Sequence, residues 1–215
     1  TGVIFGFLNQ LLQLATTFDY PQFIFTWDSK NSYRRQAYPE YKRKDKEITP
    51  EMKELLEIAK PQFNITRKLL IQIGFANNLI QSGLEADDLI AMAVRWSSQY
   101  SIIVSADNDL YQLLDANTKM WNVKDKKFYT QEDFCEEWGT YPLYWPEVKS
   151  IAGCDGDNIK GVPGIGYKTA IKYVRKELKG KKLEAIQKSP ELQKRNLDLV
   201  YLPHIKTKPI LLESD

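Results

Sequence analysis

Closely spaced carboxylates are the feature of this sequence with the clearest chemical meaning. Two dense acidic runs lie in the middle of the chain, and a further acid lies downstream in a stretch rich in glycine. These acids are Glu85, Asp87, Asp88, Asp107, Asp109 and Asp157. Like charges packed this closely raise one another's pKa values unless cations lie between them. Because hard divalent cations prefer oxygen ligands, the acids predict a Mg²⁺ or Mn²⁺ site.

Each acidic run also has an interpretation without a metal. Glu85 and the acids after it could cap a helix, because negative charge in the first turn compensates the helix dipole. Asp28 could be an ordinary turn residue after a strand, and Asp155 is more readily placed in solvent than on a cation. The joint occurrence of the runs favours metal binding over capping alone.

The elements around these acids predict where the side chains meet. Apolar residues predict buried strands at 22–27 and 101–105, and Asp28 and Asp107 follow these strands. Residues 84–99 predict an amphipathic helix with acids in its first turn. In an α/β domain with a mostly parallel sheet, ligands bind beyond the carboxyl ends of the strands. We therefore expect these acids to converge at one edge of such a sheet.

The rest of the chain alternates between predicted helices and turns. The other predicted helices span 6–18, 110–114, 130–138, 146–152 and 169–178, and residues 119–129 predict a hairpin. Thr49 predicts the N-cap of one more helix, with proline in its first turn. That helix either continues to about residue 72 or breaks near Pro61, because proline removes a hydrogen bond from a helix interior.

Composition limits the class of protein. The chain has 215 residues, of which 43% are hydrophobic and 27% are charged, as in a soluble globular protein. No apolar run approaches the roughly 20 residues of a membrane helix, so no membrane partner is expected. The two cysteines, Cys135 and Cys154, are too few for a disulfide scaffold and favour a reducing compartment. We expect a cytoplasmic protein, in the host-cell cytoplasm if it is viral, and a monomer.

Basic segments on either side of the acids indicate a polyanionic partner. Residues 33–46 mix arginine, lysine and tyrosine, which can hold the backbone of a single strand and stack its bases. A solvated basic loop is the alternative. Glycines at 161–166 can expose N–H groups to a phosphate, and the nearby lysines would make duplex binding sensitive to salt. Here an ordinary glycine turn is the alternative.

Four motifs in a fixed order resemble those of a known family. They are Thr-Trp-Asp-Ser with Tyr-Arg-Arg-Gln-Ala-Tyr-Pro-Glu-Tyr-Lys (26–42), Gly-Leu-Glu-Ala-Asp-Asp (83–88), Ser-Ala-Asp-Asn-Asp-Leu-Tyr-Gln-Leu-Leu (105–114) and Asp-Asn-Ile-Lys-Gly-Val-Pro-Gly-Ile-Gly-Tyr-Lys-Thr-Ala (157–170). The chain resembles the 5′-nuclease family of bacteriophage 5′–3′ exonucleases, flap endonucleases and the 5′-nuclease domain of bacterial DNA polymerase I.

The resemblance implies a fold and a division into domains. The fold would be a PIN-like α/β core with a mostly parallel sheet flanked by helices, joined to a helix-three-turn-helix DNA-binding module. The nuclease core would span 1–145 and include a helical arch near 33–60. The DNA-binding module and a C-terminal tail would span 146–215.

The resemblance also implies a role for each candidate residue. The first metal is assigned to Asp28, Glu85, Asp87 and Asp107, with Asp88 close by, and the second metal to Asp109 and Asp157. Catalytic contacts with the scissile phosphate are assigned to Arg34 and Lys42. DNA binding is assigned to Arg35, Tyr41, Lys160, Gly161, Gly164, Gly166 and Lys168, with Tyr41 stacking on a base. A K⁺ ion is expected in the glycine-rich hairpin.

Two departures from the family pattern matter. The family's first strand, which carries a further aspartate, is expected to be missing from this chain. Cys154 stands where the family has an aspartate of the glycine-rich motif, and thiolate is a poor ligand for Mg²⁺. The second metal position is therefore predicted to be weak, or to rest on Asp109 and Asp157.

The sequence thus predicts a structure-specific 5′ nuclease that depends on Mg²⁺ or Mn²⁺. It would act as a 5′–3′ exonuclease or flap endonuclease and hydrolyse DNA phosphodiesters near 5′ ends or flaps. An RNA–DNA hybrid is a further candidate substrate. One alternative is a catalytically impaired fragment that binds DNA junctions, which the missing strand motivates. The other is a PIN-type ribonuclease, which would not need the glycine-rich motif.

Overall fold

The computed structural model describes residues 2–19, 21–43, 49–97 and 99–213. Its contacts divide the chain into two compact units, each made of segments distant in sequence. Unit 1 comprises Thr1–Trp27, Lys44–Ile80 and Leu211–Asp215, and unit 2 comprises Asp28–Arg43 and Gln81–Ile210. None of the helices in the described ranges combines the length and apolar character that crossing a bilayer requires.

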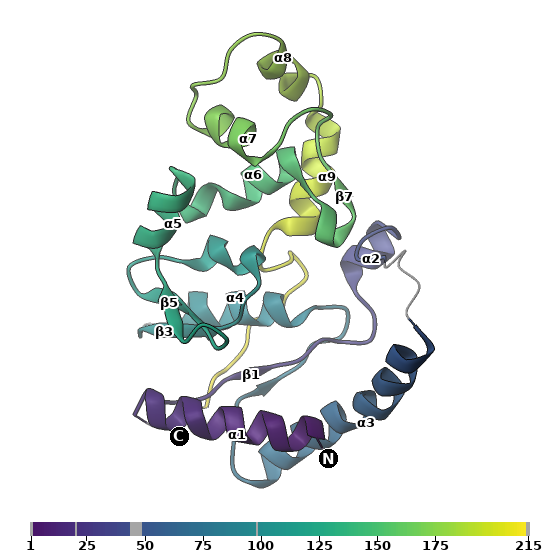
Figure 1. Cartoon of the computed structure of the whole chain (residues 1–215), viewed down its shortest axis with the longest axis vertical. Helices are drawn as coiled ribbons and strands as arrows, with labels where there is room; N and C mark the ends of the chain where they lie inside the picture. The colour runs from purple at the N-terminus through teal and green to yellow at the C-terminus, as the bar shows by residue number, and fades with distance from the viewer. Residues whose placement is uncertain (1, 20, 44–48, 98, 214–215) are drawn as a thin grey trace. The chain divides into compact units, whose positions relative to one another are not determined.

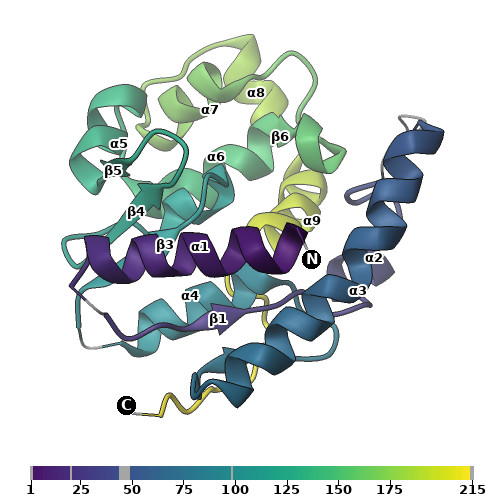
Figure 2. The ribbon, with the colours of Figure 1, turned by 60° about the horizontal axis from the view of Figure 1, so that its bottom comes forward.

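Unit 1 is built from two long helices and a pair of very short strands. Helix α1 (Gly2–Thr17) packs against α3 (Pro50–Gln72), as Figure 2 shows. Strand β1 (Phe25–Thr26) pairs in parallel with β2 (Asn78–Leu79). The ring of Phe25 lies 5.2 Å from that of Phe75 and 5.9 Å from that of Phe7, so aromatic side chains join the strand pair to the helices.

Helix α3 begins as the sequence predicts and is not broken. The Thr49 side chain accepts a hydrogen bond from the Met52 N–H, and Pro50 occupies the first turn, where no intrahelical donor is needed. The helix continues through Pro61 to Gln72, so the first of the two alternatives, a continuous helix, is correct. The predicted arch near 33–60 includes residues 44–48, which lie outside the described residues.

Unit 2 holds the remaining elements. In chain order they are α2 (Tyr33–Ala37), α4 (Ala86–Trp96), β3 (Ser101–Val104), η1 (Asn108–Leu113), β4 (Thr118–Asn122), β5 (Lys127–Tyr129), α5 (Gln131–Trp138), η2 (Pro142–Tyr144), α6 (Trp145–Ala152), β6 (Gly153–Cys154), η3 (Asp155–Asp157), β7 (Ile159–Lys160), α7 (Tyr167–Val174), α8 (Lys181–Gln187) and α9 (Pro190–Val200). Most of these follow the predicted helices and the predicted 119–129 hairpin within a few residues.

The strands form separate small sheets in the described residues, whereas the sequence predicted one mostly parallel sheet. In unit 2, β3 pairs in parallel with β4, and β4 pairs antiparallel with β5. Strands β6 and β7 form an antiparallel pair of their own. The α/β class is confirmed, since helices alternate with parallel strand pairs. The apolar run at 22–27 was expected to be a full strand, but β1 is much shorter because β2 offers only a short partner.

The core of unit 2 centres on α6. This short helix packs against α7 and α9 (Figure 1), and Trp145, Val148 and Ile151 are almost completely buried. The Trp145 ring lies 5.3 Å from the ring of Phe134 on α5. Burial on several sides fixes the position of α6 and therefore of the hairpin that follows it. The predicted domain boundary near residue 145 falls inside unit 2, and the division into domains stays a prediction.

Candidate metal centre

The first group of acids lies around the start of α4. Glu85 is the N-cap of this helix, and the Asp28 carboxylate accepts a hydrogen bond from the Ala86 N–H at 2.8 Å. Asp107 caps η1 by accepting from the Asp109 N–H at 2.9 Å. The capping interpretation of these acids is therefore correct in part. It does not exclude metal binding, because each cap uses only some of the carboxylate lone pairs.

Glu85 is held by donors from the segment before α4. Its carboxylate accepts from Ser32 Oγ at 2.6 Å, from Lys42 Nζ at 2.7 Å and from the Tyr41 hydroxyl at 3.1 Å. Burial alone would raise the pKa of Glu85, but Lys42, Ser32 and Arg34 together outweigh burial and the pKa falls. Burial would likewise lower the pKa of Lys42, yet Tyr41 and Glu85 raise it. Both groups are thus charged at neutral pH.

Asp88 forms a buried ion pair, so its surroundings differ from those of Glu85 and Asp87. Both of its oxygens accept from the Arg34 guanidinium at 2.7 Å, and one also accepts from the His204 N–H at 2.7 Å. Arg34 donates further to the carbonyls of Leu199 and Tyr201. With a fourth contact from the Glu85 backbone N–H at 3.1 Å, these bonds occupy the carboxylate of Asp88 and four of the five guanidinium N–H groups of Arg34. The geometry therefore favours a structural role for Asp88 and Arg34 over the predicted metal-binding and catalytic roles.

Asp87, one residue earlier, forms no such ion pair with another described residue. Burial raises its pKa to about 7, and the negative charges of Asp107, Asp28 and Glu85 add to the rise, against a smaller opposing effect of Lys42. This is the state expected of a carboxylate placed to share a cation with other carboxylates. The set of Asp28, Glu85, Asp87 and Asp107 offers hard oxygen donors, so these residues fit Mg²⁺ or Mn²⁺.

The second group of acids is more compact. Among the described residues, the ligand atoms of Asp109, Cys154 and Asp157 lie within 4.8 Å of one another. The Cys154 thiol donates to Asp157 Oδ2 at 3.6 Å, and burial raises the pKa of this thiol. A protonated, partly buried thiol is a poor partner for a hard cation. Asp155 is exposed, as expected.

A lysine that the sequence did not single out joins this second group. Lys149, fully buried on α6, forms an ion pair with Asp109 Oδ1 and donates to Asn108 Oδ1 at 2.9 Å. Burial lowers the pKa of Lys149, and neighbouring negative groups oppose that effect. Lys149 therefore neutralises an acid that was predicted to bind a metal.

The chain belongs by sequence to a defined nuclease family. A family model for the N-terminal, resolvase-like domain of 5′-3′ exonucleases matches residues 1–139. The chain is a member of the 5′–3′ exonuclease family. It is 36% identical to a 5′-3′ exonuclease of Halalkalibacterium halodurans over 177 residues, which are 79% of this chain and 56% of that protein. It is 32% identical to a 5′-3′ exonuclease of Bacillus subtilis over 182 residues, 81% of this chain and 59% of that protein.

Solved structures agree with this membership. The T5 D15 protein co-crystallised with metal ions matches with a TM-score of 0.81 and 26% identity, over 92% of this chain and 80% of that one. T5 5′-exonuclease with bound zinc matches with a TM-score of 0.80 and 25% identity, over 94% and 82%. The family member described here thus has the PIN-like α/β fold of these nucleases. It spans a little over half the length of the curated relatives it matches.

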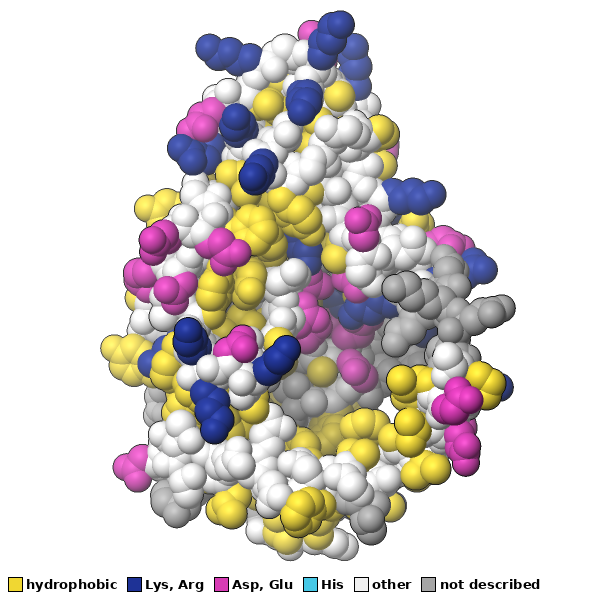
Figure 3. All heavy atoms as spheres, viewed as in Figure 1, with side chains coloured by type: hydrophobic (Ala, Val, Ile, Leu, Met, Phe, Trp, Pro, Cys, Tyr) yellow, Lys and Arg dark blue, Asp and Glu magenta, His cyan; other side chains and the backbone are white. Residues whose placement is uncertain are grey.

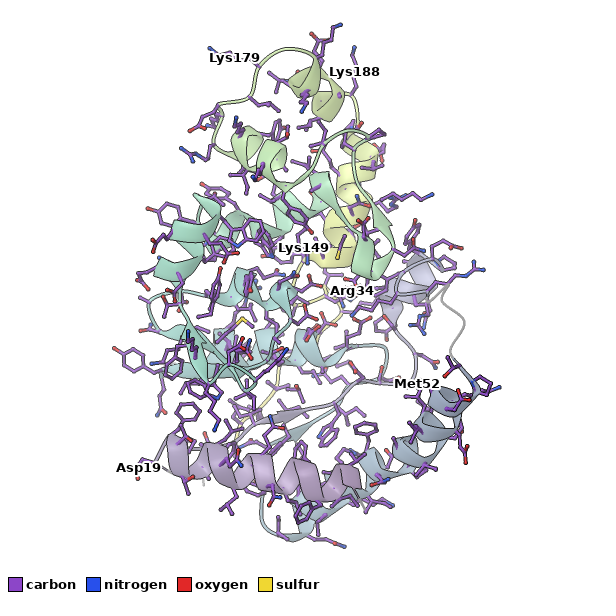
Figure 4. All side chains as sticks on the ribbon, in the orientation of Figure 1. Asp19, Arg34, Met52, Lys149, Lys179 and Lys188 are labelled. Carbon is purple, nitrogen blue, oxygen red and sulfur yellow. The ribbon has the colours of Figure 1, made fainter. Side chains whose placement is uncertain are left out.

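Some of the residues assigned to DNA binding are exposed in this family member, and others are buried or partly buried. Arg35, Lys160 and Lys168 are exposed, as are Gly164 and Gly166. Lysines also cover the end of unit 2 formed by α7 and α8, where Figure 4 labels Lys179 and Lys188 and Figure 3 shows dark blue side chains.

The structure gives Tyr41 and Gly161 packing roles that differ from the predicted contacts with DNA. The Tyr41 ring is buried with Ile159, Leu199 and Val200, which disfavours the predicted stacking on a base. A Cβ on Gly161 would lie 2.1 Å from the Ala152 carbonyl oxygen, so glycine is needed for the chain to pass the end of α6. The ordinary turn interpretation explains this glycine without a phosphate.

A closer reading of the sequence could have found Lys149. It follows Trp145 by one helical turn, on the apolar face of the predicted helix, where a lysine is unexpected. A lysine in such a position is buried only with an anionic partner. The sequence could not show that the partner is Asp109, because that contact depends on how α6 packs.

Proposed function

We propose that this chain supplies the catalytic part of a divalent-metal-dependent 5′ nuclease. Its substrate would be DNA near a 5′ end or flap, and the reaction would be hydrolysis of a phosphodiester bond. The observation that carries the proposal is the group of Asp28, Glu85, Asp87 and Asp107, in which burial and the neighbouring carboxylates raise the pKa of Asp87 to about 7. The T5 relatives were crystallised with metal ions and with zinc, which supports the proposal.

Each residue of this centre has a part in the proposed reaction. Asp28, Glu85, Asp87 and Asp107 would hold Mg²⁺ or Mn²⁺, which when bound offsets the negative charge that develops on the scissile phosphate. Lys42 is fixed beside this group at both ends. Its side-chain Nζ lies 2.7 Å from the Glu85 carboxylate, and its backbone N–H donates to the Asp157 carbonyl at 2.8 Å. Its ammonium is therefore placed to orient a phosphate of the substrate.

We further propose that the hairpin and α7 bind the duplex as part of a helix-three-turn-helix module. The chain turns at Gly164, which has a φ of +74°, and α7 starts directly after Gly166. Lys160 and Lys168 are exposed on either side of this turn. Backbone N–H groups and lysines in this arrangement would contact phosphates without reading sequence. Reversal of both lysine charges should weaken duplex binding and reduce its dependence on salt concentration.

The direct test uses a DNA flap labelled at its 5′ end. We expect cleavage in Mg²⁺ or Mn²⁺, no cleavage in EDTA, and products with 5′-phosphate ends. Binding measured in Ca²⁺ by fluorescence anisotropy should survive Asp87→Asn, while cleavage should not. Cleavage that persists in EDTA would contradict the proposal. Tight flap binding with no turnover in saturating Mn²⁺ would instead identify a junction-binding protein, and preference for RNA would identify a ribonuclease.

A further inference from the structure

The second group of acids does not match the donor chemistry of a site for Mg²⁺. Two carboxylates, Asp109 and Asp157, share their space with the Cys154 thiol, which donates its proton to Asp157. A hard cation prefers oxygen donors and gains little from a protonated sulfur. This mismatch between the donors and Mg²⁺ is specific to the second group, because the first group consists entirely of carboxylates.

A positive charge is already built into the second group. The Lys149 ammonium contacts Asp109 Oδ1 and lies 2.9 Å from Asn108 Oδ1. Lys149 is fully buried and Asp109 almost so, which prevents the side chain from exchanging its partners for water. It cancels one of the two carboxylate charges that a second divalent cation would need.

The position of this ammonium is fixed from both sides. Trp145, one helical turn before Lys149, donates its indole N–H to the Asn108 carbonyl at 2.7 Å. The same asparagine thus contacts α6 through its backbone and through its side chain. Figure 4 shows Lys149 labelled in the middle of unit 2. A lysine held in this way acts as a permanent charge. If it moved away, the side chains of Asp109 and Asn108 would be left buried without this partner.

We propose that the Lys149 ammonium takes the place of a second divalent cation, so that this chain binds one divalent cation where a two-metal nuclease binds two. The inference rests on the proposed metal-dependent function. It changes the role of Asp109 and Asp157. These acids would hold the buried lysine and the hairpin in place, and the single cation would bind to the first group.

The test is the number of Mn²⁺ ions bound by the whole chain, measured by electron paramagnetic resonance of free Mn²⁺ during titration. We expect one ion for the unchanged protein. Lys149→Met should bind two, because it frees Asp109, and Cys154→Asp should still bind one, because the Lys149 ammonium remains paired with Asp109. The matched control is Cys135→Asp on α5, which adds the same carboxylate elsewhere and should still bind one ion. Circular dichroism identifies the variants that fold.

Each outcome separates the inference from the proposed function. Two Mn²⁺ ions on the unchanged protein would overturn the inference and leave the proposed function intact. Two ions on a folded Cys154→Asp protein would also overturn it, even if Lys149→Met fails to fold. Absorbance from a sulfur–metal bond during Cd²⁺ titration, absent in Cys154→Ser, would show that the thiol takes a soft cation and would overturn it too. No bound Mn²⁺ at all would overturn the proposed function together with the inference.

Discussion

The two acidic groups of unit 2 use the same residue type in opposite ways. The first group brings Asp87 close to other carboxylates, and burial together with their charge raises the pKa of Asp87 to about 7. The second group pairs Asp109 with a buried lysine and adds a thiol. In the first group Lys42 pairs with Glu85 and leaves Asp87 without a paired cation, whereas in the second group Lys149 already pairs with Asp109. The number of acids alone does not distinguish these cases, but the nearest positive charge does.

The contrast also occurs between adjacent residues. Asp88 has a lowered pKa, because the Arg34 ion pair outweighs the effect of burial, while the pKa of Asp87 is raised. Successive helix positions point about 100° apart, so neighbours in sequence face different surroundings. Asp88 faces Arg34 and the backbone near His204. Asp87 faces the other acids. Asp88 is neutralised by an arginine within the fold, whereas Asp87 is the carboxylate that we propose for metal binding.

The largest effect of a substitution is expected on the cleavage rate at Asp87, and its absence would contradict the contrast between the two acidic groups. A cation at this centre is worth several kcal/mol of transition-state stabilisation, so Asp87→Asn should lower the cleavage rate about 1,000-fold or more. The same change should not lower the free energy of unfolding in EDTA, since it removes a repelled charge. Flap cleavage and urea unfolding check both expectations. Asp198→Asn, at an exposed acid of α9, is the control; comparable losses in the two variants would contradict the assignment.

The second largest effect is expected on stability at Arg34. Arg34→Met leaves Asp88 buried without its partner and should lower the free energy of unfolding by about 3–5 kcal/mol. Arg35→Met, at the next and exposed residue, should change it by about 0.5 kcal/mol or less. Urea unfolding followed by circular dichroism measures both values. If Arg34→Met folds as stably as Arg35→Met but does not cleave DNA, the catalytic role predicted from the sequence would be restored.

A smaller effect, on stability and on the reactivity of Cys154, is expected at Asn196 and tests whether the second group is rigid. Asn196 on α9 is fully buried and donates to the carbonyls of Ser150 and Lys160, which flank the hairpin. Asn196→Ala should lower the free energy of unfolding by about 1–3 kcal/mol. It should also speed the reaction of Cys154 with a thiol reagent, measured in a Cys135→Ser background. Lys194→Ala on the same helix is the control, and equal reaction rates would contradict the role of Asn196.

The smallest effect is expected at the Tyr41 hydroxyl. Tyr41→Phe removes one of several donors to Glu85 and should lower the free energy of unfolding by only about 0.5–1.5 kcal/mol. Mn²⁺ affinity should change by less than about tenfold, because Lys42 and Ser32 still hold Glu85. Calorimetry of Mn²⁺ binding compares this variant with Tyr38→Phe. A loss of all Mn²⁺ binding in Tyr41→Phe would show that this hydroxyl, and not the set of carboxylates, controls the first group.

Much of the local structure follows from the sequence itself. The N-cap at Thr49 and the hairpin ending at Tyr129 are found where they were expected, and the capping box at Glu85 and Asp88 agrees with the capping alternative for that acidic run. These features depend on contacts between residues a few positions apart, which a sequence displays directly. The choice of acids as the probable centre also came from the sequence, because the strands and helix starts that carry them are local elements.

The tertiary structure alone decided which acids are paired. Asp88 meets His204 and Arg34, Asp109 meets Lys149, and Tyr41 is covered by α9. Each of these partners lies dozens of residues away in sequence, so no periodic pattern predicts the contact. The physical reason is that the state of a carboxylate depends on burial and on the nearest charge, and both are set by packing. The sequence by itself determined the kind of chemistry, and the fold determined which carboxylates are left to perform it.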